Sequence, residues 1–461
     1  MQKEISTEKK SFYKMVLLIA VPIMIQNGIT TFVSLLDNIM IGQIGTSSMS
    51  GVSIVNQILN VYNIGIFGLV SGAGIFSAQF FGSGDEKGFK EAMRFKVLSG
   101  LVVSILVIFL FFFNGEFLIS LFINDSDAVM RKEALEAGIN YLSIMSIQII
   151  PFTIIQAYSS SLRERGETIV PMISGIAAVG VNMMLNWVLI FGKLGFPVLG
   201  VKGAAIATVI SRFVELTVVV LWAHLSKKQK IFSKGLYTSF YISKSLIKKI
   251  LITGAPLMLN EILWAGGQAV IMGGYSLRGL TTVAAFNISS TLSGLFNVVF
   301  IALGNAISII VGQLLGAKKF KEAKSTATRL IIFSTFTCVG VGLILACFSP
   351  FFPKLYNTTD DVRNLATVFL LIASLFLPSY SFMNATYFTL RSGGKTLITF
   401  LFDSVFVWVV SIPLCYLLVN FTLLPVAVIY FICQASELIK CVIGYVLVKK
   451  GVWINNIVSE N

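Results

Sequence analysis

The sequence contains few charged residues and few of the side chains that enzymes use for chemistry. Only 12% of its 461 residues are charged, whereas a soluble globular domain has roughly 25%. Its single histidine, His224, cannot by itself form a histidine metal site or a histidine-activated nucleophile. Its five cysteines include no C-x-x-C pair, so neither a zinc site nor a disulfide framework is indicated. No metal site, no cofactor and no enzymatic activity are expected.

Apolar residues are abundant and occur in long blocks. They make up 56% of the chain, and the mean hydropathy is +0.86. Runs of about 20 mostly apolar residues can cross a bilayer core of about 30 Å as helices. The sequence therefore predicts an all-α polytopic membrane protein, whose first span is too long to be a cleaved signal peptide. The twelve predicted spans are 14–37, 50–80, 95–114, 135–160, 169–191, 203–225, 247–274, 283–313, 328–350, 364–390, 396–419 and 424–447.

The net charge of +14 reflects membrane topology and not nucleic-acid binding. Lys and Arg gather at both termini and in the even-numbered connections between the predicted spans. Such an asymmetry is the positive-inside pattern, which places both termini in the cytoplasm. We expect a multi-pass protein of a bacterial cell membrane whose surroundings are the lipid bilayer, with no nucleic-acid partner.

The chain repeats itself. With a shift of 234, "AVPIMIQN" (20–27) falls on "GAPLMLNE" (254–261), and "AQFFGSGDEKGFKEA" (78–92) falls on "GQLLGAKKFKEA" (312–323). "SLRERGETI" matches "TLRSGGKTL" at a shift of 228. Matches that keep their order along the chain indicate an internal duplication.

Each repeat holds six predicted spans, so both halves enter the membrane in the same orientation. We therefore expect two six-helix bundles, 1–232 and 233–461, related by a pseudo-twofold axis along the membrane normal. A substrate path between the bundles follows from this arrangement.

Three acids lie within the spans without a basic residue nearby in the sequence. They are Glu261, Asp37 and Asp403. Intramembrane charges are costly and are usually functional. A carboxyl group in such a place that alternates between neutral and charged forms can hold and release a proton or a sodium ion, and Glu261 is the strongest candidate. Since no nucleotide-binding domain is present, an ion gradient remains as the energy source.

Two further acids have a structural explanation. Glu215 lies three residues after Arg212, and Glu437 lies three residues before Lys440. This spacing places the charged groups together on one helix face. We expect intrahelical ion pairs at both positions.

Pro22 and Pro256 occupy equivalent positions in the two repeats, each beside polar residues within a span. Proline in a membrane helix frees a backbone carbonyl and permits bending. Helix bending and ordinary packing of small residues are both open readings for these positions.

Four motifs together carry a resemblance to a known family. They are "VPIMIQNGITTFVSLLDNIMIGQIG", "GAPLMLNEILWAGGQ", "VGQLLGAKKFKEA" and "TLRSGGKT". The chain resembles the MATE family, the multidrug and toxic compound extrusion transporters, over nearly its whole length. The resemblance implies a monomeric antiporter that uses Na⁺ or H⁺ to export organic cations and drugs by alternating access.

The site residues of the family carry over unevenly. The resemblance assigns Asp37 and Glu261 to cation or proton coupling, with a transient Na⁺ at Glu261, and Asp403 is a further candidate. The family's acid in span 10 is missing here, and that span offers Tyr380 and Asn384 instead. The candidate residues of a substrate cavity are Gln26, Asn182, Asn186, Asn260, Tyr380 and Asn384.

The alternative within the same superfamily is a flippase for lipids or lipid-linked saccharides. Such a protein needs a cavity rich in Arg and Lys to hold a pyrophosphate. Away from the span ends, Arg212 and Lys440 are the only basic residues inside the predicted spans, which favours the antiporter.

Overall fold

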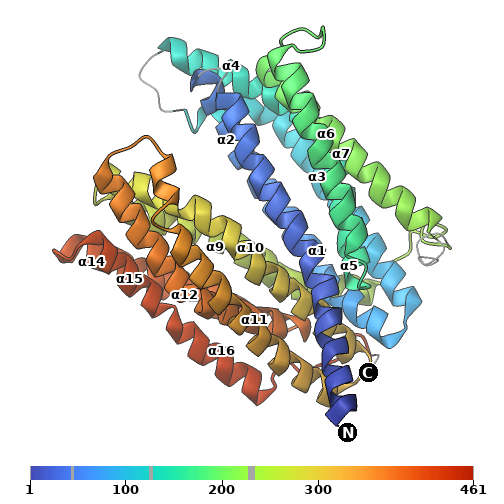
Figure 1. Cartoon of the computed structure of the whole chain (residues 1–461). Coiled ribbons are helices and arrows are strands. Elements are labelled where there is room, and N and C mark those ends of the chain that lie inside the picture. The colour runs from blue at the N-terminus through green and yellow to red at the C-terminus, as the bar shows by residue number, and fades with distance from the viewer. Residues whose placement is uncertain (1, 43–45, 124–127, 227–233, 460–461) are drawn as a thin grey trace. The chain divides into compact units, whose positions relative to one another are not determined.

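The computed structural model describes residues 2–42, 46–123, 128–226 and 234–459, and side chains are not described for 2–11, 34–39, 41–48 and 128. Within these ranges the chain forms helices and no strand (Figure 1). The all-α prediction is confirmed.

The helices of the first half follow the predicted spans. They are α1 (Gln2–Gly42), α2 (Thr46–Ser83), α3 (Glu86–Ser120), α4 (Ala128–Met145), η1 (Ser146–Gln148), α5 (Ile149–Glu164), α6 (Ile169–Phe191) and α7 (Gly200–Leu225). The end of α6 shows a local cause: Gly192 adopts a left-handed conformation with φ of 64°, which glycine reaches without steric cost.

The second half contains several long helices and two predicted spans that are divided into shorter elements. They are α9 (Lys244–Ser276), α10 (Leu280–Gly316), α11 (Phe320–Phe348), η3 (Phe352–Leu355), α12 (Asp360–Ser392), α13 (Thr396–Phe400), η4 (Leu401–Val405), η5 (Val407–Ser411), α14 (Ile412–Phe421), α15 (Val426–Ser436) and α16 (Leu438–Lys450). The segment from α13 to α14 is one span in which two turns are π-helical.

Eleven of the described helical segments are long and apolar enough to cross a membrane. The seventh predicted span, 247–274, lies within α9, a continuous helix of 33 residues that carries Asn260 and Glu261 near its middle. The chain is therefore a multi-pass membrane protein.

The chain forms two compact units. The N-unit consists of Val21–Ser77 and Glu86–Lys249, and the C-unit consists of Met1–Ala20, Ala78–Asp85 and Ile250–Asn461. Both α1 and α2 contribute residues to each unit. In α1 the boundary between the units falls between Ala20 and Val21, next to Pro22.

The bulk of each predicted domain falls in a different unit, but the division at 232/233 stays a prediction. The same holds for the pseudo-twofold axis.

Each unit has its own apolar core. In the N-unit, α6 packs along α7, and α3 packs along α5. Its core includes Val55, Ile66, Ile119 and Ile149, which are all buried. In the C-unit, α12 packs against both α10 and α11, and the rings of Phe369 and Tyr430 are 4.8 Å apart at their centroids. These cores hold the helices that carry the polar residues described next.

Within the C-unit, the end of α2 crosses the end of α10 at very short distance. A Cβ atom on Gly82 would lie 1.9 Å from the carbonyl oxygen of Gln313, and one on Gly316 would lie 1.9 Å from that of Gln79. The sequence repeat aligns Gln79 with Gln313 and Gly82 with Gly316, so the two contacts are equivalent under the repeat. Only glycine permits such an approach of two backbones.

Candidate functional site

Asn260 is the centre of a hydrogen-bond network in the C-unit. It lies on α9 and is 2% exposed. Its side-chain Nδ2 donates to Tyr387 Oη on α12 at 3.3 Å and to Asp403 Oδ2 at 3.1 Å. Its Oδ1 accepts from the Ser404 hydroxyl at 2.7 Å and from the Ser404 backbone N–H at 3.3 Å. Both N–H groups and the oxygen of the Asn260 amide are thus hydrogen-bonded, and the bond to Asp403 fixes the position of that carboxylate.

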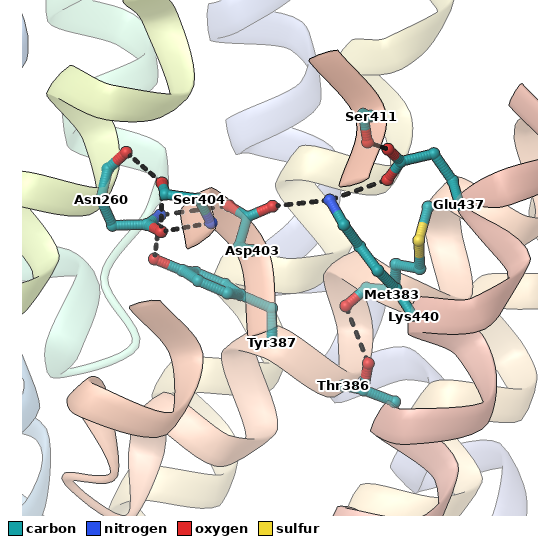
Figure 2. A network of polar contacts seen from close by, with 9 residues as sticks. All are labelled: Asn260, Met383, Thr386, Tyr387, Asp403, Ser404, Ser411, Glu437 and Lys440. Atoms are coloured by element: carbon teal, nitrogen blue, oxygen red, sulfur yellow. Dashed lines mark hydrogen bonds and ion pairs between the residues drawn. The ribbon is translucent and has the colours of Figure 1, made fainter. Parts of the chain in front are cut away.

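Asp403 continues the network toward α16. Its Oδ1 lies 3.3 Å from the Lys440 ammonium, and the same ammonium lies 2.7 Å from Glu437 Oε2. The Ser411 hydroxyl donates to Glu437 Oε1 at 2.6 Å. Figure 2 shows Lys440 extended between the two carboxylates, with Asn260 on the far side of Asp403. The arrangement joins α9, the α13–α14 segment and α16 through polar contacts.

The backbone around Asp403 is wider than an α-helix. Residues 401–405 and 407–411 form π-helical turns. Such turns are rare and occur frequently at functional sites. Here they place Asp403 and Ser404 against Asn260, and Trp408 donates from its indole N–H to the backbone oxygen of Leu263 on α9 at 2.9 Å.

Glu261 follows Asn260 directly in the chain and is half-buried. Among the described residues it forms no hydrogen bond and no ion pair. The charged groups that act on it electrostatically are Arg391 and Asp403. The C-unit therefore gathers the acids of two predicted spans, and Glu261 has both carboxylate oxygens available.

Sequence similarity to known proteins identifies the family. The MatE family model matches residues 22–188 and 256–417. The chain belongs to the MatE family. The chain is therefore a membrane transporter and not an enzyme.

Two curated relatives and one solved structure illustrate the similarity. A "Probable multidrug resistance protein NorM" of Oceanobacillus iheyensis is 24% identical over 427 residues, 91% of this chain and 92% of the relative. The protein of the same name from Bacillus cereus is 28% identical over 433 residues, 91% of each chain. A crystal structure of MATE in complex with MaL6 superposes with a TM-score of 0.86 at 18% identity, covering 95% of this chain and 96% of that one.

In the N-unit, this MatE chain has a counterpart of the Asn260 position. Gln26, which the repeat aligns with Asn260, accepts a hydrogen bond from Arg163 Nη2 at 2.7 Å. Its side chain also lies against Gly175. Asn182 and Asn186 are buried, and Asn186 Nδ2 donates to Asn182 Oδ1 at 3.2 Å. These residues lie in the N-unit, whereas Asn260 lies in the C-unit.

The remaining predicted residues have distinct surroundings. Tyr380 donates a hydrogen bond to Gln434. The amide oxygen of Asn384 is buried and has no hydrogen-bond partner in the described part of the chain. Pro22 and Pro256 both lie inside continuous helices. The side chain of Asp37 lies outside those that the structure describes. Participation of these residues in coupling, in a substrate cavity or in helix bending stays a prediction.

Both intrahelical ion pairs are confirmed. Arg212 and Glu215 are 2.7 Å apart, and Lys440 and Glu437 are also 2.7 Å apart. The sequence did not reveal that Lys440 reaches Asp403 as well, because those two residues lie 37 positions apart on different helices. A basic residue three positions from an acid can be recognised in the sequence. A contact between residues of two different spans produces no such local pattern.

Sequence reasoning also missed a buried ion pair in the N-unit. Lys96 is fully buried and its Nζ lies 2.5 Å from Glu164 Oε2. Its ammonium also donates to the hydroxyls of Ser160 and Ser161. Lys96 is the second residue of the predicted span 95–114 and groups by sequence with the basic connection before it. The description of Arg212 and Lys440 as the only basic residues inside the spans therefore left out a buried one.

Proposed function

We propose that the chain exports organic cations, including drugs, in exchange for Na⁺ or H⁺ across a bacterial cell membrane. It acts as a monomer with both termini in the cytoplasm. Two curated relatives carry the name of a multidrug resistance protein, which supports drug export. The observation that carries the proposal is the placement of Glu261 and Asp403 beside Asn260, within otherwise apolar helices.

A shared negative site is sufficient for exchange. An organic cation and the coupling ion are both attracted to the carboxylate of Glu261, so occupation by one lowers the affinity for the other. Competition of this kind couples the two fluxes when the site faces each side of the membrane in turn. Bending at Pro256 or Pro22 gives α9 and α1 a means to change shape when the ion binds.

Glu261 is the carboxylate that the ion meets without displacing another partner, and Asp403, which acts on it electrostatically, is the second carboxylate of the site. Asp403 already accepts hydrogen bonds from Asn260 and Lys440 on its two oxygens. The oxygens of Glu261 have no such partners among the described residues. Oxygen ligands suit hard cations such as Na⁺, and the same carboxylate serves a proton equally well. No other cofactor is required.

The flippase alternative has little support from the buried basic residues. Lys96 is paired with Glu164, and Lys440 lies between two carboxylates. The acids Glu215 and Glu164 act electrostatically on Arg163. A buried basic group that is already neutralised is poorly suited to hold a pyrophosphate.

The test uses liposomes that contain the purified protein and are preloaded with ethidium. A pH gradient and a sodium gradient are imposed in separate experiments, and dye efflux is followed by fluorescence. We expect one gradient to drive efflux in the wild type, and Glu261→Gln to abolish it because the neutral amide cannot exchange a cation. Glu322→Gln is the matched control, since Glu322 is an exposed acid of the same half.

Each result discriminates between the candidate functions. If neither gradient moves the dye, drug export fails and lipid translocation becomes the better hypothesis. If Glu261→Gln transports as well as the wild type, coupling does not depend on this carboxylate.

A further inference from the structure

The ammonium group of Lys440 is shared unequally between two carboxylates. It is 2.7 Å from Glu437, which lies on the same stretch of chain, and 3.3 Å from Asp403, which lies on the neighbouring span. The face of the Phe406 ring is 5.1 Å away and adds a cation–π contact. The Lys440 side chain is 5% exposed. Glu437 is thus the firm attachment and Asp403 the looser one (Figure 2).

The cluster is not electrically balanced when all three groups are ionised. Asp403 and Glu437 carry two negative charges and Lys440 carries one positive charge. A buried charge without compensation is costly, so the cluster has the capacity for one further positive charge. The Asp403 side chain is 24% exposed and that of Glu437 is 15% exposed. Of the two carboxylates, Asp403 is therefore the one that a small cation from outside the cluster reaches more easily.

We propose that Lys440 is a tethered cation that neutralises Asp403 while the coupling ion is absent and withdraws to Glu437 when that ion binds. The inference rests on the proposed antiport. The withdrawn position already exists, because Glu437 holds the ammonium at salt-bridge distance and is itself held by the Ser411 hydroxyl. Only the longer of the two contacts has to open.

Such a lysine has a clear consequence for transport. During the half of the cycle in which the organic cation is carried, Asp403 is never an unpaired carboxylate in an apolar bundle. The cost of binding the coupling ion rises in return, since the ion must displace Lys440 from Asp403. Lys440 is therefore a positioning residue that sets the apparent cation affinity of the site.

Other charged and titratable groups surround the cluster on each side. On the side of Asp403 are Glu261, Arg391 and Tyr387, and on the side of Glu437 are Tyr380, Cys433 and Cys441. Arg391 is the other base in this set, and it acts on Glu261 and Tyr387. Lys440 is the base that contacts Asp403 directly.

The test measures cation binding without any drug. The melting temperature of the purified protein in detergent is followed as NaCl replaces KCl at constant ionic strength, and separately as the pH is lowered in KCl. A cation that binds the folded state raises the melting temperature. We expect Lys440→Gln to reach half of its stabilisation at a concentration of Na⁺ or H⁺ about ten-fold lower than in the wild type, because the internal competitor is gone.

Two further variants make the result decisive. Arg212→Gln removes an intrahelical ion pair of equal length and spacing in α7, and it should leave the cation dependence unchanged. The double variant Lys440→Gln with Glu437→Gln keeps the net charge of the cluster, so it provides the measurement if the single variant does not fold. We expect it to show the same ten-fold shift.

A wild-type cation dependence in both Lys440 variants would overturn the inference and leave Lys440 with a structural role. The proposed export function fails separately, through absence of dye efflux in liposomes. A shift in cation binding without dye efflux would therefore retain the tethered cation and reject drug export.

Discussion

Lys96 and Glu164 of the N-unit depend on each other. Both side chains are removed from solvent, with exposed fractions of 0% for Lys96 and 9% for Glu164. When one partner of a buried pair is lost, the other remains as an uncompensated charge. When both are lost, the cost is small, because the desolvation penalty disappears with them.

Lys96→Met is expected to lower the free energy of unfolding by about 3–5 kcal/mol. The reason is that Glu164 loses its cation while it stays buried. Adding Glu164→Gln to this variant should recover most of the loss. Unfolding titrations with SDS in mixed micelles measure both values. A double variant as unstable as the single one would show that Lys96 contributes through packing and not through its charge.

Sequence reasoning at this scale found polar positions but not their partners. Glu261, Asp403 and Asn260 were visible because a polar residue stands out in an apolar run. The hydrogen bonds of Asn260 to Tyr387 and Asp403 were not visible, since they join helices 127 and 143 positions apart. The pairing of Glu437 with Lys440 was predictable because it lies within one helix turn.

At the scale of helices, the crossing of α2 and α10 depends on two glycines. The space for a Cβ atom on Gly316 is taken by the backbone of Gln79 and not by a flexible side chain. The tail after α16 packs at the same place: Asn456 Nδ2 donates to the carbonyl oxygens of Leu315 and Gly316 at 2.9 and 3.0 Å. A wider crossing would therefore also disturb the tail.

Gly316→Ala is expected to destabilise the protein by about 1–3 kcal/mol, because the two helices must move apart. Gly340→Ala is the matched control. Gly340 lies in α11 with no atom within 4 Å of a Cβ position, so alanine there should stabilise the helix by up to about 1 kcal/mol. Melting temperatures in detergent distinguish the two cases. Equal effects of both substitutions would show that the crossing tolerates a side chain.

At the scale of the whole molecule, the linker between the repeats is fixed to the N-unit. The Arg94 guanidinium donates to the carbonyl oxygens of Leu236, Gly235 and Tyr241 at 2.6, 3.0 and 3.1 Å. Glu91 accepts from the backbone N–H of Ser243 at 2.9 Å. The described part of this basic connection is thus an ordered segment packed on its own unit.

The proposed orientation predicts the behaviour of reporter fusions. Green fluorescent protein attached after the C-terminus should fluoresce, and alkaline phosphatase attached there should be inactive, because that end lies in the cytoplasm. Alkaline phosphatase inserted at Phe196, in the connection between α6 and α7, should be active. The opposite pattern would reverse the topology.

The fold class was predictable because span length and hydropathy are set by the bilayer and need no knowledge of contacts. The repeat was predictable because duplicated sequences keep their order. The extent of each compact unit was not predictable, because α1 and α2 are each divided between the units and hydropathy alone does not show which helices contact each other. The π-helical turns around Asp403 likewise left no pattern in the sequence.

The reciprocal contact at the α2–α10 crossing bears on the ancestry of the chain. Gln79 meets Gly316, and its repeat partner Gln313 meets Gly82. A contact in which residue i touches residue j while j touches i is the mark of an isologous interface between two identical subunits. A gene for a six-helix homodimer, duplicated and fused, would leave this imprint inside a single polypeptide.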